Sequence, residues 1–282
     1  MHIKESELWY AQDTSPFSIE FARKTEPHTM PMEHFHPQYE IYYLLSGERY
    51  YFIGDQTYHI QSGDLVFIKS QEVHRTSEAA IPKHERVVFY FFESFIREHY
   101  GDHAPLLLRP FHEDNPVYRL KGKEFLQVGS LLHNMLAELQ MRPAGYEIRM
   151  EMTLIDLLLL AARHTTKRET TLSPLKSSLH QKMTEITRYI RMNVTEDLSL
   201  SSLAEKFYMS PYYLSRTFKE LTAFTITEYV QTVRIRQAQR LLKETNLSIL
   251  DISIQVGFEN FSHFGKVFKK VAQQSPREYR KE

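Results

Sequence analysis

The 282-residue sequence contains no cysteine, a single tryptophan and no net charge. Without cysteine the chain can form neither disulfide bonds nor thiolate metal sites. Because Lys plus Arg and Asp plus Glu both total 35, a generally basic nucleic-acid coat protein is disfavoured. Long hydrophobic runs are also lacking, since the most apolar stretch, Leu154 to Ala162, contains Asp156 and is too short to cross a bilayer. No apolar segment follows Met1, so we expect a cytoplasmic protein with no membrane partner.

Charge and histidine are unevenly distributed along the chain. Residues 180–282 hold 16 Lys and Arg against 11 Asp and Glu, whereas residues 1–179 hold 19 against 24. Of the 14 histidines, 12 precede residue 180. The length is typical of about two domains. The basic C-terminal part therefore indicates an anionic partner, and the histidine-rich N-terminal part indicates a different task.

The first third of the chain has the pattern of short antiparallel strands. Aromatic and β-branched residues gather in short runs, and Gly47, Gly54 and Gly63 mark turns between some of them. The expected strands are Phe17 to Phe21, Glu40 to Leu45, Tyr50 to Ile53, Thr57 to Ile60, Leu65 to Ile68 and Val87 to Phe92. Strands at this spacing predict an antiparallel sandwich or barrel over residues 1–120.

The middle of the chain changes to a helical period. Apolar residues recur at helical spacing from Lys123 to Met141 and from Tyr146 to His164, which predicts a helical hairpin over residues 121–164. The run Leu157 to Leu160 is more apolar than one buried face requires, so we expect the hairpin to support a homodimer. Alternatively, both helices simply cover the barrel. The polar residues 165–179 are expected to form a linker.

The C-terminal part contains an internal repeat. The pattern Ser210-x-x-x-Leu214-x-Arg216-x-Phe218-Lys219 returns 50 residues later as Asn260-x-x-x-Phe264-x-Lys266-x-Phe268-Lys269. Ser and Asn are typical residues at the N-terminus of a helix, and a shorter capped helix precedes each copy. Two helix-turn-helix units are therefore predicted within an all-helical segment, residues 180–282. The alternative is a plain helical bundle in which the repeats are packing units.

The second helix of each predicted unit would present side chains to DNA. If Leu214, Phe218, Phe264 and Phe268 are core residues, the remaining faces are polar, small or basic. Such residues can contact phosphates and base edges in the major groove. The candidate DNA-binding residues are Tyr212, Tyr213, Ser215, Arg216, Lys219, Phe261, Ser262, Gly265 and Lys266.

These motifs resemble the AraC/XylS family of bacterial transcription regulators between about Leu198 and Lys281. The resemblance is carried by Leu203-Ala204, Ser210-Pro211, Leu214 to Lys219, Arg234, Ala238, Leu241-Leu242, Ile252, Val256-Gly257-Phe258, Phe264, Val267 to Lys270, Ser275-Pro276 and Tyr279-Arg280. It implies that each unit places its second helix in one of two successive major-groove segments. Family members often have glycine where this chain has Ala223 and Gln273, which puts the ends of both helices in question.

A second group of residues points to ligand chemistry in the barrel. His34, His36 and Glu40 precede or open a strand, with Gly47 beyond, and this spacing resembles the first cupin motif. Gly63-Asp64 and His74 resemble a loose second cupin motif. The candidate effector-binding residues are His34, His36, Glu40, Tyr42 and His74. The three His and Glu40 could instead hold a divalent metal, or serve only as structural polar groups.

These observations favour an α+β protein. It has a cupin-like antiparallel barrel with a helical hairpin, followed by an all-α double helix-turn-helix domain. We expect a non-enzymatic transcription regulator that activates its targets and needs no cofactor. Its partners would be double-stranded DNA, RNA polymerase and a small polar effector, with a carbohydrate as the favoured class. The alternative is a metal-dependent cupin enzyme with a helical interaction module.

Overall fold

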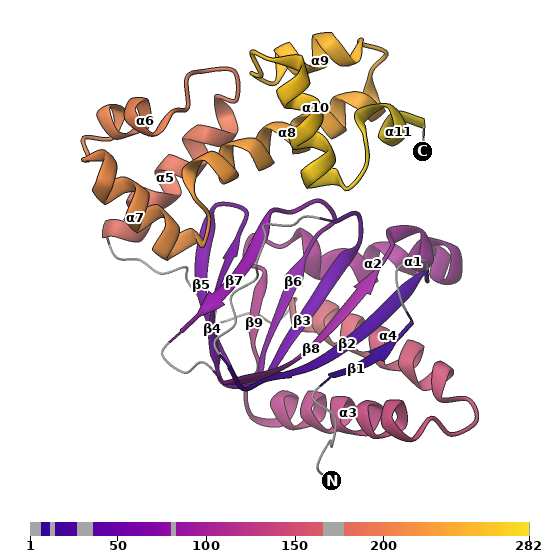
Figure 1. Cartoon of the computed structure of the whole chain (residues 1–282). Helices are drawn as coiled ribbons and strands as arrows, with labels where there is room; N and C mark the ends of the chain where they lie inside the picture. The colour runs from indigo at the N-terminus through magenta and orange to yellow at the C-terminus, as the bar shows by residue number, and fades with distance from the viewer. Residues whose placement is uncertain (1–6, 12–14, 27–35, 80–82, 166–177, 282) are drawn as a thin grey trace.

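The computed structural model describes residues 7–11, 15–26, 36–79, 83–165 and 178–281. Two antiparallel β-sheets form the N-terminal part, and a helical domain lies against one end of them (Figure 1). We call the two sheets together the barrel. The expected α+β architecture, with strands first and an all-helical C-terminal domain, is confirmed.

The described residues of the barrel form nine strands. The larger sheet has the order β1-β2-β8-β3-β6-β9 and the smaller sheet the order β5-β4-β7, with antiparallel pairing throughout. The strands are β1 (Glu7–Tyr10), β2 (Phe17–Lys24), β3 (Tyr39–Ser46), β4 (Glu48–Ile53), β5 (Gln56–Gln61), β6 (Asp64–Ile68), β7 (His74–Glu78), β8 (His84–Phe91) and β9 (Val117–Arg119). All six strands expected from the sequence are present, whereas β1, β7 and β9 were not predicted.

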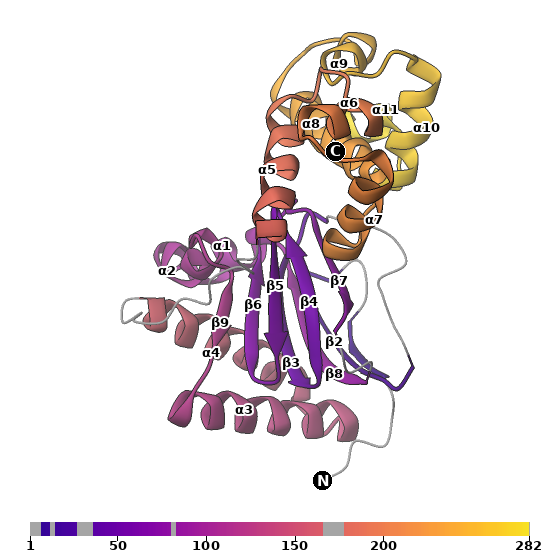
Figure 2. The same cartoon turned by 90° about the vertical axis from the view of Figure 1, so that its left-hand side faces the viewer.

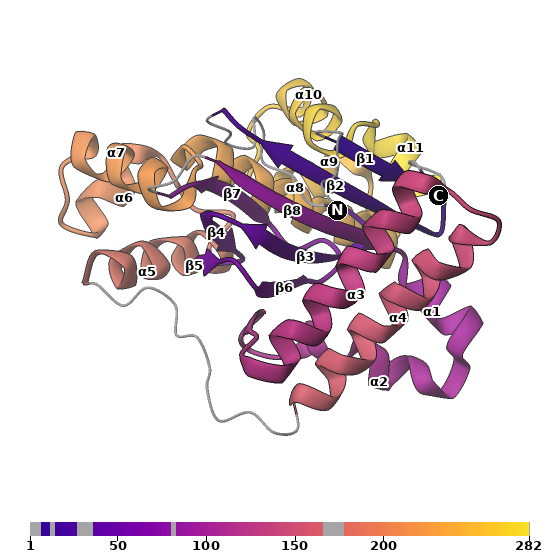
Figure 3. The same cartoon turned by 90° about the horizontal axis from the view of Figure 1, so that it is seen from below.

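The larger sheet has a different environment on each face. One face meets the smaller sheet through a buried cluster that includes Tyr42, Tyr51 and Val88. The other face packs against helices through a second cluster that includes Phe67, Phe89 and Leu132 (Figure 3). The short helical segments of this layer are α1 (Glu93–Tyr100), η1 (Gly101–His103), α2 (Ala104–Leu108) and η2 (Arg109–His112). Both faces are buried, so the strands show little of the usual alternation between apolar and polar residues.

The predicted helical hairpin is present as α3 (Gly122–Met141) and α4 (Tyr146–Thr165). Ile148 and Met152 belong to the apolar period that predicts α4, but they do not lie on its buried face. Met150, Leu154 and Leu157 of α4 are fully buried, whereas Ile148 is 65% exposed and Met152 is 50% exposed. The sequence period marks an apolar helix face but does not say which neighbouring helix or sheet covers it.

The helical domain contains α5 (Ser178–Met192), α6 (Leu200–Lys206), α7 (Pro211–Thr222), α8 (Ile226–Glu244), α9 (Ile249–Gln255), α10 (Phe261–Ala272) and α11 (Pro276–Lys281). The side chains of Ser199, Ser210, Ser248 and Asn260 accept hydrogen bonds at the first turns of four of these helices, as expected. Thr225 and Glu228 form a capping box at the start of α8. Most of the expected linker, residues 166–177, lies outside the described residues.

The two positions where glycine was expected end their helices without it. Ala223 follows α7 with φ 65°, and Gln273 follows α10 with φ 59°. Both are left-handed conformations, which cost a residue with a Cβ atom roughly 1–2 kcal/mol. The helix-turn-helix geometry is therefore retained at the expense of local strain.

Candidate DNA-binding surface and effector cluster

The second helices of the two helix-turn-helix units, α7 and α10, bury equivalent faces. Leu214 and Phe218 in α7, like Phe264 and Phe268 in α10, are fully buried, as the repeat predicts. Both helices lie on the same side of the helical domain (Figure 2). Tyr212 is 76% exposed, Tyr213 49% and Phe261 49%, while Ser215 and Gly265 are partly buried. Each helix therefore presents one open face that begins at its capped N-terminus.

Most candidate DNA-binding residues lie on these open faces. Arg216, Lys219, Ser262 and Lys266 are exposed. Arg216 donates to Glu220 at 2.7 Å one helical turn away, and both side chains are more than half exposed. Such an exposed pair contributes little to stability. The guanidinium can therefore exchange Glu220 for a phosphate or a base edge at small cost.

The helix α8 fixes the two units relative to each other. It contacts α7 and α9 to α11, and its residues Tyr229, Ile235 and Ala238 are fully buried. Near its middle, Arg234 donates to the backbone carbonyls of Val194 and Glu196, which precede α6. The separation of α7 and α10 is thus set by a packed 19-residue helix rather than by a loop.

The second candidate site is a polar cluster inside the barrel. His36 Nε2 lies 3.1 Å and His74 Nε2 3.3 Å from Glu40 Oε2. The Tyr51 hydroxyl donates to the other carboxylate oxygen, Glu40 Oε1, at 2.7 Å. Glu40 and His74 are each 1% exposed, and the side chain of His36 is 16% exposed. Tyr90 closes one side, with its ring centroid 5.4 Å from that of His36.

The cluster holds charge despite its burial. Burial disfavours the carboxylate form of Glu40, but His74 and His36 outweigh it and hold the pKa of Glu40 well below its ordinary value. Burial also disfavours the charged form of His74, but the adjacent Glu40 carboxylate raises the pKa of His74 above its ordinary value. An anion and a cation therefore stabilise each other inside the barrel.

Only some of the sequence-predicted effector residues come together here. His36, Glu40 and His74 lie together, and because β3 begins at Tyr39, His36 precedes the strand and Glu40 lies among its first paired residues. Tyr42 is buried two residues along β3, and its hydroxyl has no hydrogen-bond partner among the described residues. Burial raises the pKa of Tyr42 to about 12, so the phenol stays neutral. His34 lies outside the described residues.

Sequence reasoning missed further charged groups in the barrel. Arg86 donates to Glu20 at 2.6 Å, and both side chains are largely buried. Arg49 is fully buried and donates to Thr76 at 3.4 Å. Arg86 directly follows Glu85, and Glu20 lies between two apolar residues of β2, as a solvent-facing residue would. No local signal in the sequence therefore placed this pair in the barrel interior.

The cluster also fits a metal ion. His36 Nδ1 lies 3.0 Å from the Gln38 carbonyl oxygen, and His74 Nδ1 lies 2.8 Å from that of Glu72. A carbonyl oxygen can only accept, so each Nδ1 carries a proton, and Nε2 is the ring atom that faces Glu40. A metal would bind both Nε2 atoms in their deprotonated form. Metal-binding histidines are commonly oriented in this way. The ligand atoms of His36, Glu40 and His74 all lie within 4.8 Å of one another.

None of the helices in the described parts of the chain is long and apolar enough to cross a membrane.

Comparisons with known proteins match both halves of the chain. The family described as AraC-like ligand binding domain matches residues 16–82, and the one described as Helix-turn-helix domain matches residues 203–282. The uncharacterized HTH-type transcriptional regulator YfiF of Bacillus subtilis is 26% identical and covers 88% of this chain and 78% of its own. The HTH-type transcriptional activator RhaR of Mannheimia succiniciproducens is 21% identical and covers 96% and 94%.

A solved structure also matches the helical domain. The C-terminal domain of AraT, a response regulator from Geobacillus stearothermophilus, is 33% identical and covers 37% of this chain and 88% of its own, with a TM-score of 0.36. The two family matches cover most of the barrel and most of the two helix-turn-helix units. The chain belongs to the AraC/XylS family of transcription regulators, with a ligand-binding and a DNA-binding domain.

Proposed function

We propose that this regulator activates transcription when a small polar effector, a carbohydrate in the first instance, binds inside the barrel. The main supporting observation is the buried His36–Glu40–His74 cluster within the domain that matches a ligand-binding family. The name of the similar regulator RhaR, a transcriptional activator, supports the sign of regulation. The effector would act by binding more tightly to one of two states that differ in DNA affinity.

The proposed DNA contacts are the nine residues on α7 and α10 that the sequence singled out. Arg216→Ala should weaken binding to a specific operator by about 1–3 kcal/mol if the guanidinium reads a base. If it contacts phosphate, binding should weaken to a similar extent on all sequences. Arg97→Ala is a matched control, because Arg97 forms the same type of i,i+4 pair with Glu93 on the distant helix α1.

The experiment starts with an operator selected from genomic DNA fragments by the purified full-length chain. Fluorescence anisotropy of that operator then compares the wild type, Arg216→Ala and Arg97→Ala over a range of salt concentrations. A steep salt dependence with a defined footprint is expected of a specific regulator. Equal operator affinities for the wild type and Arg216→Ala would show that Arg216 does not contribute to DNA binding.

The effector proposal rests on hydrogen-bonding groups in the barrel interior. Glu40 can accept from a sugar hydroxyl, Tyr42 offers a hydroxyl, and the rings of Tyr51 and Tyr90 flank the cluster. A panel of neutral monosaccharides should contain one that changes the operator affinity of the wild type. Glu40→Gln and Tyr42→Phe should abolish this response without changing basal DNA binding. A ligand that binds without altering the DNA-binding curve would refute effector control.

A divalent metal is the second candidate for the cluster, because both Nδ1 atoms face backbone carbonyls. His36, Glu40 and His74 would hold it as a two-histidine, one-carboxylate set, and the metal would supply open positions for oxygen ligands. Elemental analysis and Mn²⁺ titration should then give one metal per chain, lost in His74→Ala. His59→Ala is a matched control, because His59 pairs with Glu48 on the smaller sheet, apart from the cluster. Stoichiometric metal together with turnover would favour the enzyme alternative.

We also propose a homodimer formed through the hairpin and a contact with RNA polymerase. The hairpin exposes Leu126 (69%) on α3 and Ile148 (65%) and Met152 (50%) on α4. Exposed apolar side chains of this size favour association. Ile148→Glu/Met152→Glu should give a monomer in sedimentation velocity, whereas the wild type should sediment as a dimer.

A further inference from the structure

A cleft lies between the barrel and the helical domain, apart from both candidate sites. Its volume is 470 Å³, within the range of roughly 300–1,000 Å³ that is typical of small-molecule sites. The barrel contributes Gly54, Gln71 and Val73, and the helical domain contributes Arg191, Tyr229, Val233, Arg236, Gln237, Gln239, Arg240, Lys243 and Tyr279. None of these residues belongs to α7 or α10, so the cleft is distinct from the candidate DNA-binding faces.

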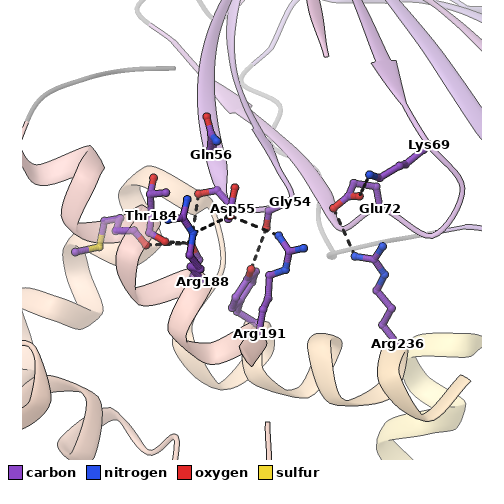
Figure 4. A network of polar contacts seen from close by, with 12 residues as sticks. Gly54, Asp55, Gln56, Lys69, Glu72, Thr184, Arg188, Arg191 and Arg236 are labelled. Atoms are coloured by element: carbon purple, nitrogen blue, oxygen red, sulfur yellow. Dashed lines mark hydrogen bonds and ion pairs between the residues drawn. The ribbon is translucent and has the colours of Figure 1, made fainter. Parts of the chain in front are cut away.

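The lining of the cleft is strongly basic. Among the described residues, four cationic side chains line it, from Arg191, Arg236, Arg240 and Lys243, and no acidic residue does. Carboxylates at the rim reach two of the four: Asp55 lies 3.6 Å from Arg191, and Glu72 lies 3.5 Å from Arg236 (Figure 4). Arg240 pairs with Glu244 on its own helix at 3.8 Å, and more than half of each side chain is exposed. The cleft can therefore accept further negative charge.

The same cleft offers hydrogen-bond acceptors. Gln239 is 5% exposed, and its side-chain oxygen has no hydrogen-bond partner among the described residues. The side-chain oxygen of Gln71, across the cleft, is also buried and has no hydrogen-bond partner among the described residues. A buried acceptor without a donor typically costs about 1–3 kcal/mol. Hydroxyl groups of a ligand would supply the missing donors.

From these observations we infer that the cleft binds an anionic small molecule rich in hydroxyl groups, such as a phosphorylated sugar or polyol. The phosphate would contact Arg240 and Lys243, and the hydroxyls would donate to Gln239 and Gln71. Guanidinium groups bind phosphate through charge-assisted hydrogen bonds, which are stronger than neutral ones. This ligand is separate from the effector in the barrel.

Such a ligand would hold the two parts of the chain together. The parts already meet directly, because Tyr229 donates to the Gly54 carbonyl at 2.9 Å and Thr57 donates to that of Leu221 at 2.8 Å. A molecule that contacts both α8 and Gln71, in the loop between β6 and β7, can bind only when the helical domain is packed against the barrel. It therefore stabilises the docked arrangement by RT ln(1 + L/Kd), where L is the free ligand concentration.

Isothermal titration calorimetry of the full-length chain, without DNA, tests the site with glucose 6-phosphate, inorganic phosphate and glucose. Glucose 6-phosphate should bind one per chain, and phosphate should bind more weakly. Arg240→Ala/Lys243→Ala should weaken both by about 10- to 100-fold. Gln239→Leu should weaken glucose 6-phosphate alone by roughly fivefold, about one neutral hydrogen bond. Circular dichroism confirms that each variant is folded.

Arg188→Ala is the matched control, because Arg188 pairs with Asp55 at 3.8 Å across the same interface but does not line the cleft. Its affinity for glucose 6-phosphate should stay within about twofold of the wild type. The proposal is overturned if neither anion binds, or if Arg240→Ala/Lys243→Ala binds as the wild type does. Any glucose binding that remains in Arg240→Ala/Lys243→Ala would be assigned to the effector site in the barrel and not to the cleft. Since no DNA is present, failure of the regulator proposal would leave this result unchanged.

Discussion

Phe52 makes the docking of the two parts of the chain measurable. It lies on β4, is 3% exposed, and its ring centroid lies 5.6 Å from that of Phe224 and 5.8 Å from that of Tyr229. Together with Val73 it joins the hydrophobic core of the helical domain. Phe52→Ala should cost about 3–5 kcal/mol, as for a core phenylalanine. The docking equilibrium constant would then fall roughly 100- to 4,000-fold.

Two spectroscopic probes separate docking from general destabilisation during urea unfolding. Trp9, the single tryptophan, lies on β1 and reports on the barrel, whereas circular dichroism reports on the helices. In Phe52→Ala the two unfolding curves should separate, and the less stable part should unfold at lower urea than in the wild type. Tyr50→Ala is the control, since Tyr50 lies two residues earlier on β4 but packs against His59 of the barrel and is 36% exposed. Superimposed curves with a wild-type midpoint in Phe52→Ala would refute the reasoning.

Further predictions concern the helix ends. Gln273→Gly should stabilise the chain by about 1 kcal/mol in urea unfolding, because glycine adopts φ 59° without strain; an unchanged midpoint would contradict this. Thr225→Ala should destabilise it by about 1 kcal/mol through loss of the cap of α8, whereas Thr225→Ser should not. Burial raises the pKa of Glu228, but hydrogen bonds to Thr225 outweigh this effect and lower the pKa overall. The ionised Glu228 therefore stabilises the fold above the ordinary carboxyl pKa, and this stabilisation is lost as the pH falls through the lowered pKa. The wild type should therefore lose its advantage over Glu228→Gln on acidification, and a pH-independent difference in midpoint would exclude this linkage.

Local signals in the sequence were sufficient for most of the helical domain. Capping residues, a fixed repeat and apolar spacing are all short-range features, and they located α6, α7, α9 and α10, with the buried faces of α7 and α10. The left-handed ends at Ala223 and Gln273 follow the same plan even without glycine. Packing of Phe224 and neighbouring core residues evidently outweighs a strain of roughly 1–2 kcal/mol.

Long-range pairing limited what could be predicted in the barrel. The His36–Glu40–His74 cluster was found because its residues resemble a known spacing. Arg86 and Glu20 were missed, because their pairing joins residues 66 apart in the sequence and depends on strand order. The docking of Phe52 was missed for the same reason, since an aromatic residue on a strand gives no sign of which surface will cover it.

The helix α8 has a consequence for the spacing of an operator. At 1.5 Å per residue its 19 residues span about 28 Å, and packing against both helix-turn-helix units prevents this length from adjusting. B-DNA completes a turn in about 10.5 base pairs, so one inserted base pair rotates the second subsite by about 34° around the axis. A binding site with both half-sequences intact but one base pair out of phase would then have to be twisted or bent to be bound. The protein would thus discriminate between binding sites by the rotational phase of their two halves as well as by their sequence.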